Sequence, residues 1–179
     1  MKKTAAVFIF IFMTGLFAGL FFSISLTEEN SGYLSALFLS SVTDTSSGFF
    51  RTLFSSLISN MSLAALMLAS IVTKLLFPLP PALLWYKSFA LGFCSGLVYI
   101  GDTEQSLMIS LVKILPSNLF FIPAFIMLSA VCFTYSRNEL VKTKRPSREK
   151  RGLQSVVFIC LGLIFAGCVT EALFHPIAL

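Results

Sequence analysis

The stretch AAVFIFIFMTGLFAGLFFSI, residues 5–24, decides the class of fold. It carries no charged side chain, and it directly follows Lys2, Lys3 and Thr4. A helix rises about 1.5 Å per residue, so roughly 20 apolar residues cross the hydrocarbon core of a bilayer. Across all 179 residues, 56% are hydrophobic and only 12% are charged, which excludes an ordinary soluble domain. We therefore predict a membrane protein.

A positive start before an apolar run is also typical of a secretory signal peptide. Ser23-x-Ser25 would supply its small-x-small cleavage site. The apolar run is longer than the core of most signal peptides, and further apolar segments follow it. We therefore expect an uncleaved first helix. Its Gly15 and Gly19 form a GxxxG face, which allows the backbone of another helix to approach closely.

Four more apolar segments predict an all-α polytopic protein with five transmembrane helices, in a single integral membrane domain of residues 1–179. The expected spans are about 5–25, 60–78, 83–100, 107–135 and 153–174. The second span ends at PLPP, residues 78–81, because prolines lack an amide donor and favour an extended turn. The third span carries a second GxxxG face at Gly92 and Gly96.

The fourth apolar segment is too long for one straight span and contains Pro116 and Pro123. Each proline removes a bond from the helical ladder, and Ser117 and Asn118 are placed to satisfy the freed groups. We expect a broken or kinked helix, with a half-span before Pro116 as one arrangement. Broken helices near the middle of a membrane mark binding sites in many transporters, although proline kinks are also ordinary in membrane helices.

The region between the first two spans, residues 26–59, is polar and rich in serine. Its bulky residues recur at helical spacing, with serines on the opposite face. They are Tyr33, Leu34, Leu37 and Phe38, then Phe49, Phe50, Leu53, Phe54, Leu57 and Ile58. We predict extracytoplasmic amphipathic helices that lie on the membrane surface.

Charge distribution predicts the orientation. With the amino terminus in the cytoplasm of a bacterial inner membrane, the basic residues fall inside and most acidic residues outside, as the positive-inside rule requires. The inside set is Lys2, Lys3, Lys74, Lys87 and the basic loop 137–152, and the outside set is Glu28, Glu29, Asp44, Asp102 and Glu104. The carboxyl terminus is then extracytoplasmic. The net charge of +5 is thereby explained without nucleic acid.

The sequence offers no catalytic or metal-binding motif. One histidine excludes an HExxH site, and neither a GxSxG elbow nor a Walker loop is present. The four cysteines lie in apolar stretches without CxxC spacing, so we read them as buried small hydrophobes. We predict a non-enzyme with no cofactor.

Two segments resemble the stage II sporulation protein M family. They are KSFALGFCSG, residues 87–96, and ILPSNLFFIP, residues 114–123. Asn60 ahead of the second span and Glu171 near the end of the last span extend the resemblance. It implies five spans with the amino end inside. It also implies a non-enzymatic membrane scaffold that localises peptidoglycan-degrading partners, stage II sporulation proteins D and P, at the septal and engulfing membrane during endospore formation, on its mother-cell side.

Together, the packing and partner-contact candidates are Asn60, Lys87, Gly92, Phe93, Gly96, Lys113, Pro116, Asn118, Pro123 and Glu171. Polar groups inside a membrane are costly and suggest function. Lys113 and Glu171 are a candidate pair, the alternative being that each reaches the interface separately. Glu171 and His175 share a helical face, where they could share a proton or an ion, although His175 also fits a plain interfacial residue.

Two functions of different classes remain. The scaffold would act through its glycine faces and its outer amphipathic region, with the lipid bilayer and a second copy of the chain as further candidate partners. The alternative is a small transporter or channel component built on the broken fourth span.

Overall fold

The computed structural model describes residues 2–43, 48–72, 76–101, 114–140 and 147–174. Within these ranges the regular elements are helices. They are α1 (Lys2–Ile24), α2 (Glu28–Thr43), α3 (Phe49–Val72), α4 (Leu79–Gly101), α6 (Leu115–Leu140) and α7 (Ser147–Phe174). All but α2 contain a stretch long and apolar enough to cross a membrane, which confirms the predicted number of spans.

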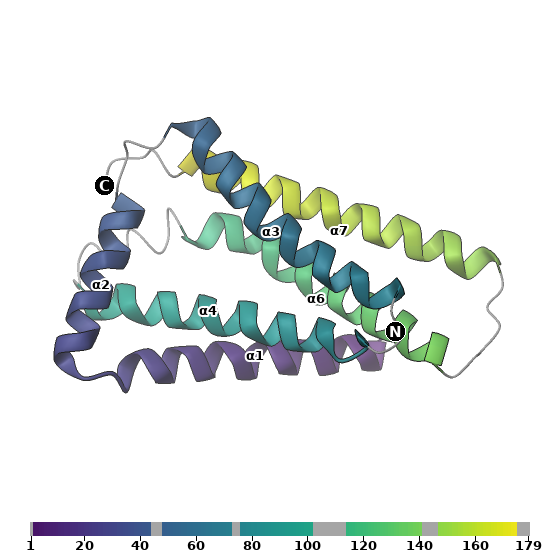
Figure 1. Ribbon diagram of the computed structural model, residues 1–179, viewed down its shortest axis with the longest axis horizontal. Coiled ribbons are helices and arrows are strands. Elements are labelled where there is room, and N and C mark those ends of the chain that lie inside the picture. The colour runs from purple at the N-terminus through teal and green to yellow at the C-terminus, as the bar shows by residue number, and fades with distance from the viewer. Residues whose placement is uncertain (1, 44–47, 73–75, 102–113, 141–146, 175–179) are drawn as a thin grey trace.

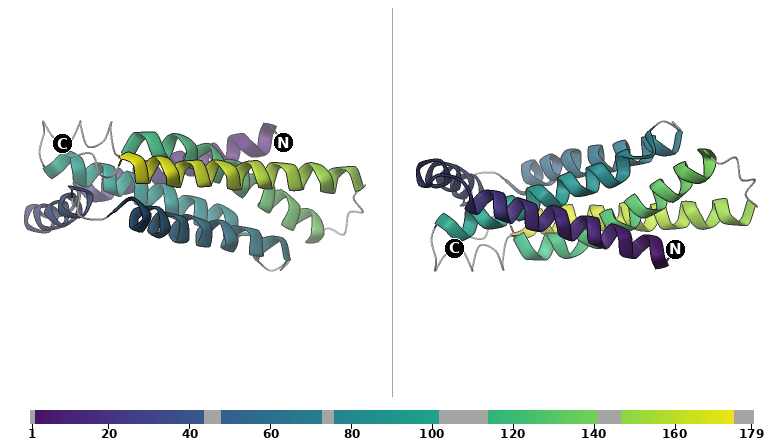
Figure 2. Two further views of the ribbon diagram at one scale, coloured as in Figure 1. Left: turned by 90° about the horizontal axis from the view of Figure 1, so that it is seen from above. Right: turned by 90° about the horizontal axis from the view of Figure 1, so that it is seen from below.

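The five long helices run roughly along one common direction, and α2 lies across one end of the bundle (Figure 1). Helix α1 packs against α4, α6 packs against α7, and α3 contacts both α7 and α6. Figure 2 shows the same bundle from above and below, with α2 at the end away from the amino terminus. We call this end the α2 end.

Helix α3 corrects the boundary expected for the second span. The apolar stretch begins at Phe49 and not at residue 60, so the Phe49–Ile58 pattern belongs to the span and not to a surface helix. The physical reason is continuity: no proline or glycine interrupts residues 49–72. The bulky face, with Phe50, Phe54 and Ile58, is exposed, whereas Ser56 and Ser70 of the same helix are buried.

The prolines of the fourth span do not interrupt helix α6. Pro116 is the second residue of α6, where its missing amide would have no intrahelical acceptor in any case. Pro123 lies inside the helix, which continues to Leu140. The half-span envisaged before Pro116 falls outside the described residues.

Glycines hold α1 and α4 together at backbone distance. A Cβ atom at Gly19 would collide with the carbonyl oxygen of Phe89, and one at Gly92 with the carbonyl oxygen of Leu16. A Cβ at Gly96 would collide with the Ser23 hydroxyl. The two GxxxG faces therefore pack against one another, so they are occupied within the chain and are not free for partners.

Aromatic stacking extends the α1–α4 contact. Phe93 stacks on Phe89 with ring centroids 6.3 Å apart. The ring centroid of Phe22 in α1 lies 5.9 Å from that of Phe93. The core beyond this contact contains Cys132, Cys160 and Cys168, all buried, whereas Cys94 is half-buried. The described cysteines are unpaired thiols, in agreement with their interpretation as small hydrophobes.

Candidate functional site

The candidate site begins with two polar residues on helix α3. Ser56 and Asn60 are four residues apart, so they lie one above the other on one helical face. That face turns into the bundle, and the two side chains are only 7% and 4% exposed. The Asn60 amide donates to the Ser56 carbonyl oxygen at 2.9 Å and to its hydroxyl oxygen at 3.2 Å. Asn60 is thereby fixed in one orientation, with its carbonyl oxygen available to a donor.

Lys87 of α4 supplies that donor. Its Nζ donates to the Asn60 Oδ1 at 2.7 Å. Lys87 is the ninth residue of α4, which places it about 12 Å along the helix axis from Leu79. The charge pattern of the sequence places this lysine at the cytoplasmic interface. The structure corrects that interpretation, because the ammonium group lies inside the bundle and bonds to a buried side chain.

Glu171 of α7 completes a chain of hydrogen bonds. The Ser56 hydroxyl donates to Glu171 Oε2 at 2.5 Å. A cation and an anion from two helices are therefore linked through two neutral side chains of a third helix, in the order Lys87, Asn60, Ser56, Glu171. Hydrogen bonds to charged groups are about twice as strong as neutral ones, so this chain orders all four side chains.

Two aromatic rings of α6 line the other side of Lys87. Its Nζ lies 5.4 Å from the ring centre of Phe121 and 5.5 Å from that of Phe125. A ring face attracts a cation through its negative quadrupole, most strongly where water is scarce. Phe121 and Phe125 are one turn apart, so both rings face the same ammonium group.

The first turn of α6 adds Ser117 and Asn118. The Asn118 amide donates to the carbonyl oxygen of Ile114 at 2.8 Å, and the Ser117 hydroxyl donates to the same oxygen at 3.3 Å. Both side chains thus bond to a backbone acceptor beside Pro116. The carbonyl group that Pro116 itself leaves without a donor, four residues earlier, lies outside the described residues, so the predicted role of the two side chains stays a prediction. Ser117 is buried, and Asn118 is half-buried.

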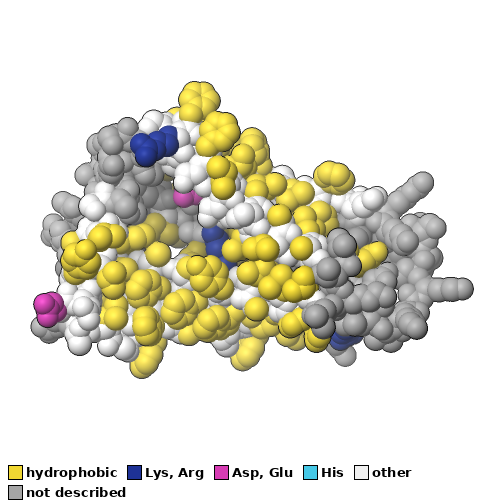
Figure 3. Space-filling model, in the orientation of Figure 1, with side chains coloured by type: hydrophobic (Ala, Val, Ile, Leu, Met, Phe, Trp, Pro, Cys, Tyr) yellow, Lys and Arg dark blue, Asp and Glu magenta, His cyan; other side chains and the backbone are white. Residues whose placement is uncertain are grey.

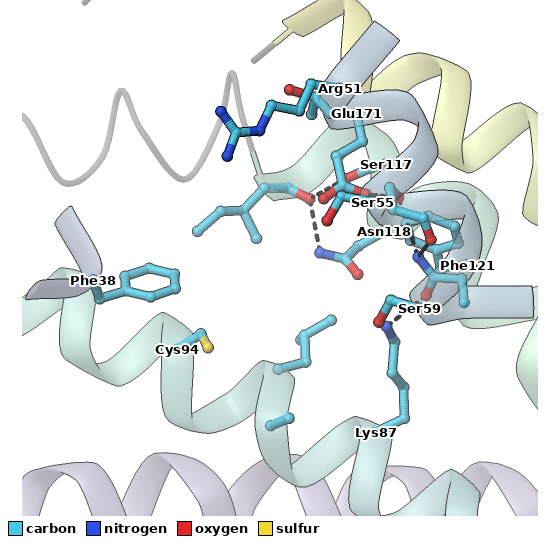
Figure 4. Close-up of a pocket in the computed structure, with 16 residues that line it drawn as sticks. Phe38, Arg51, Ser55, Ser59, Lys87, Cys94, Ser117, Asn118, Phe121 and Glu171 are labelled. Carbon is cyan, nitrogen blue, oxygen red and sulfur yellow. Dashed lines mark hydrogen bonds between the residues drawn. The ribbon is translucent and has the colours of Figure 1, made fainter. Parts of the chain in front are cut away.

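These side chains line a cavity of about 650 Å³ that is open to the surface, which we call the polar cavity. Figure 4 shows Lys87 extending from α4 toward α3, with Glu171, Ser117 and Asn118 on the far side and Phe38 at the α2 end. Its lining comprises Phe38, Arg51, Thr52, Ser55, Ser56, Ser59, Asn60, Lys87, Ala90, Leu91, Cys94, Ile114, Ser117, Asn118, Phe121 and Glu171. Figure 3 shows a hollow in the molecular surface that contains basic and acidic side chains and is bordered by hydrophobic ones.

The comparison with family models gives one match. A model described as Stage II sporulation protein M matches residues 7–176. The chain belongs to the stage II sporulation protein M family. No curated protein and no solved structure gives a significant match. Members of the family are not known as enzymes.

The two stretches that resemble the family supply part of the lining of the polar cavity. Residues 87–96 supply Lys87, and residues 114–123 supply Asn118, while Asn60 and Glu171 come from the two outlying positions of the resemblance. Pro116 begins α6 beside the cavity, and Pro123 lies further along the helix. Gly92, Phe93 and Gly96 lie at the contact with α1 instead. Lys113 and His175 are outside the described residues, and so is the predicted pairing of each with Glu171.

Sequence reasoning missed Ser56 and Arg51 as cavity residues. The four-residue spacing from Ser56 to Asn60 was a usable signal, but the expected start of the second span at residue 60 separated the two residues.

With two basic side chains and one carboxylate, the described lining of the polar cavity carries one excess positive charge. Among the described residues no group of three His, Cys, Asp or Glu side chains is placed to hold a metal ion.

Proposed function

We propose that this membrane protein is a non-enzymatic scaffold that holds peptidoglycan-degrading partners at the septal and engulfing membrane during endospore formation. The partners would resemble stage II sporulation proteins D, a lytic transglycosylase, and P, an amidase and endopeptidase. Family membership supports the link to sporulation. Helix α2 is the observation that supports a docking role.

Helix α2 presents its large side chains outward. Ser31 and Ser35 are buried, whereas Tyr33 is 69% exposed and Leu37 is 54% exposed. Helix α2 packs against α4. Its small residues face the bundle and Phe38 borders the polar cavity, whereas Tyr33 and Leu37 point away from the bundle. Exposed aromatic and aliphatic groups on a helix outside the spans are a natural contact for a partner domain. We name Tyr33 and Leu37 the α2 ridge.

The orientation required by this role follows from charge. The amino terminus and the basic loop 137–152 would be cytoplasmic, which places α2 and the carboxyl terminus outside, where the peptidoglycan lies. The position of Lys87 inside the bundle, where it is half-buried, leaves this assignment intact, because Lys2, Lys3, Lys74 and the basic loop would still share one side.

The test is co-purification of the wall hydrolases with tagged protein from sporulating cells. Replacing Tyr33 and Leu37 together by Ala should lower hydrolase recovery by about fivefold or more, since a few central aromatic and aliphatic residues carry most interface energy. The matched control is Ala36→Ser, a change of small size on the same exposed helix. Equal recovery from the double variant and the control, at equal membrane levels, would exclude the α2 ridge as the docking surface.

The polar cavity favours one second candidate, a transporter or channel component. A path for a solute would use the cavity and Glu171, so Glu171→Ala would abolish a flux and leave hydrolase recovery unchanged. The scaffold role predicts the opposite result. Hydrolase recovery would fall when the α2 ridge is changed, and there would be no solute flux for Glu171→Ala to abolish.

A further inference from the structure

We propose that the polar cavity binds the anionic, hydroxyl-bearing head group of a membrane lipid, with Lys87 holding its phosphate. This assignment is independent of the scaffold role, which rests on α2. Packing alone does not explain why the described helices place charged side chains around this cavity.

Incomplete pairing of Lys87 is the first support. An ammonium group has three donors, and among the described residues only Asn60 accepts from it. Glu171 reaches it through Ser56 and Asn60 and not by direct contact. A lysine inside a membrane domain is costly unless its charge is compensated, and the rings of Phe121 and Phe125 compensate only part of it. Within the part of the chain that the structure describes, two donors of Lys87 therefore remain for an anion in the cavity.

The rest of the lining matches a head group that carries more than a phosphate. Arg51, exposed at the rim, adds a second cation. Hydroxyl groups of Thr52, Ser55 and Ser59 and the amide of Asn118 line the same space. A volume of about 650 Å³ lies within the range of pockets for small organic ligands and exceeds what one inorganic ion fills. Hydroxyl-rich lining around two cations suits a phosphodiester with a polyol.

Position favours a lipid over a dissolved anion. The lining residues belong chiefly to spans α3, α4, α6 and α7, so the cavity lies within the membrane part of the chain. Hydrophobic side chains border the hollow in Figure 3. Phe54 and Ile58 are exposed on the neighbouring face of α3, where acyl chains could lie while the head group entered the cavity.

Binding of phosphatidylglycerol to the purified full-length protein tests the proposal. Its apparent Kd is measured in detergent by native mass spectrometry and by the lipid-induced rise in Tm, beside phosphatidylcholine and inorganic phosphate. Lys87→Met keeps the length of the stem without the charge, and it should weaken binding about tenfold or more. Arg51→Gln, at an exposed position, should weaken it severalfold.

Glu171→Gln gives a result of opposite sign. It keeps an acceptor for Ser56 and removes the only described negative charge of the lining, so phosphatidylglycerol should bind severalfold tighter. Arg137→Gln, an exposed basic residue at the other end of the bundle, is the matched control and should change nothing.

Three results would overturn the assignment. They are equal affinity for phosphatidylcholine, an equal rise in Tm with inorganic phosphate at the same concentration, and loss of binding in Glu171→Gln to the extent seen in Lys87→Met. The last would mean that the charged pair only supports the fold. If Lys87→Met does not fold, unchanged binding in both Arg51→Gln and Glu171→Gln is the decisive contrary result.

Discussion

Helix α4 has two faces of opposite character. The face with Ser88, Gly92 and Gly96 touches α1 at backbone distance. The face with Lys87 and Cys94 borders the polar cavity. Lipid gives helices no hydrophobic reason to associate, so close contact depends on small residues. The close contact with α1 therefore fixes the position of α4, and α4 in turn fixes the position of Lys87 at the polar cavity.

The largest effect is expected from Gly92→Leu, which changes the face of α4 that contacts α1. Its Cβ would collide with the backbone of Leu16, and backbone cannot move aside as a side chain can. The free energy of unfolding should fall by about 3 kcal/mol or more. Unfolding in mixed micelles measures the loss.

The control for this change is Gly162→Leu. Gly162 lies in α7, and no atom of a neighbouring residue lies within 4 Å of the place that a Cβ would take, so a side chain there projects into open space. We expect a change within about 0.5 kcal/mol. Equal losses at the two glycines would mean that the α1–α4 contact is not tight.

A smaller effect is expected from Asn60→Ala, which removes the α3 partner of Lys87 on the other face of α4. The change removes the acceptor of Lys87 and both donations to Ser56. Leaving buried polar groups unsatisfied should lower the free energy of unfolding by about 2 kcal/mol. Ser62→Ala on the same helix is the control, since its hydroxyl donates only locally to the Ser59 carbonyl oxygen at 2.9 Å. A loss no greater than that of the control would show that the hydrogen-bond chain contributes nothing to stability.

The smallest effect is expected at Gly167 of α7, which lies against Phe121, a ring that borders the polar cavity. A Cβ at Gly167 would lie 2.5 Å from the Phe121 ring, which can rotate away. Gly167→Ala should therefore lower the free energy of unfolding by about 1 kcal/mol. In a Phe121→Leu background the loss should largely disappear, because the smaller side chain leaves room. A loss that persists there would place the strain elsewhere than on this ring.

The sequence predicted much of the fold because its signals are local. Apolar length gave the five spans, and the Gly15 and Gly92 motifs predicted close backbone contact. They did not predict that these motifs meet one another, since partner choice among helices is a tertiary property. The start of α3 was misplaced because its serines look like a surface helix until they are seen to face a cavity.

The site shows the same division. Asn60, Lys87, Asn118 and Glu171 were named from sequence, and the structure brings them to one cavity. The sequence nevertheless places Lys87 at the membrane interface. It lies only a few residues after the prolines of residues 78–81, and lysines that flank a span often reach the interface. Only the register of α4 against α3 shows that the ammonium group meets Asn60. Contacts between distant segments set that register, and no local pattern encodes it.

The glycine contact also bears on the order of assembly at the ribosome. The apolar stretch of α1, Thr4–Ile24, has a mean hydropathy of 2.4, whereas that of α4, Leu79–Ile100, has 1.3. The first helix can therefore rest in lipid alone while the chain is still being made. The later helix is less apolar, so we expect it to gain more from packing against the Gly15 and Gly19 face of α1 once it leaves the translocon.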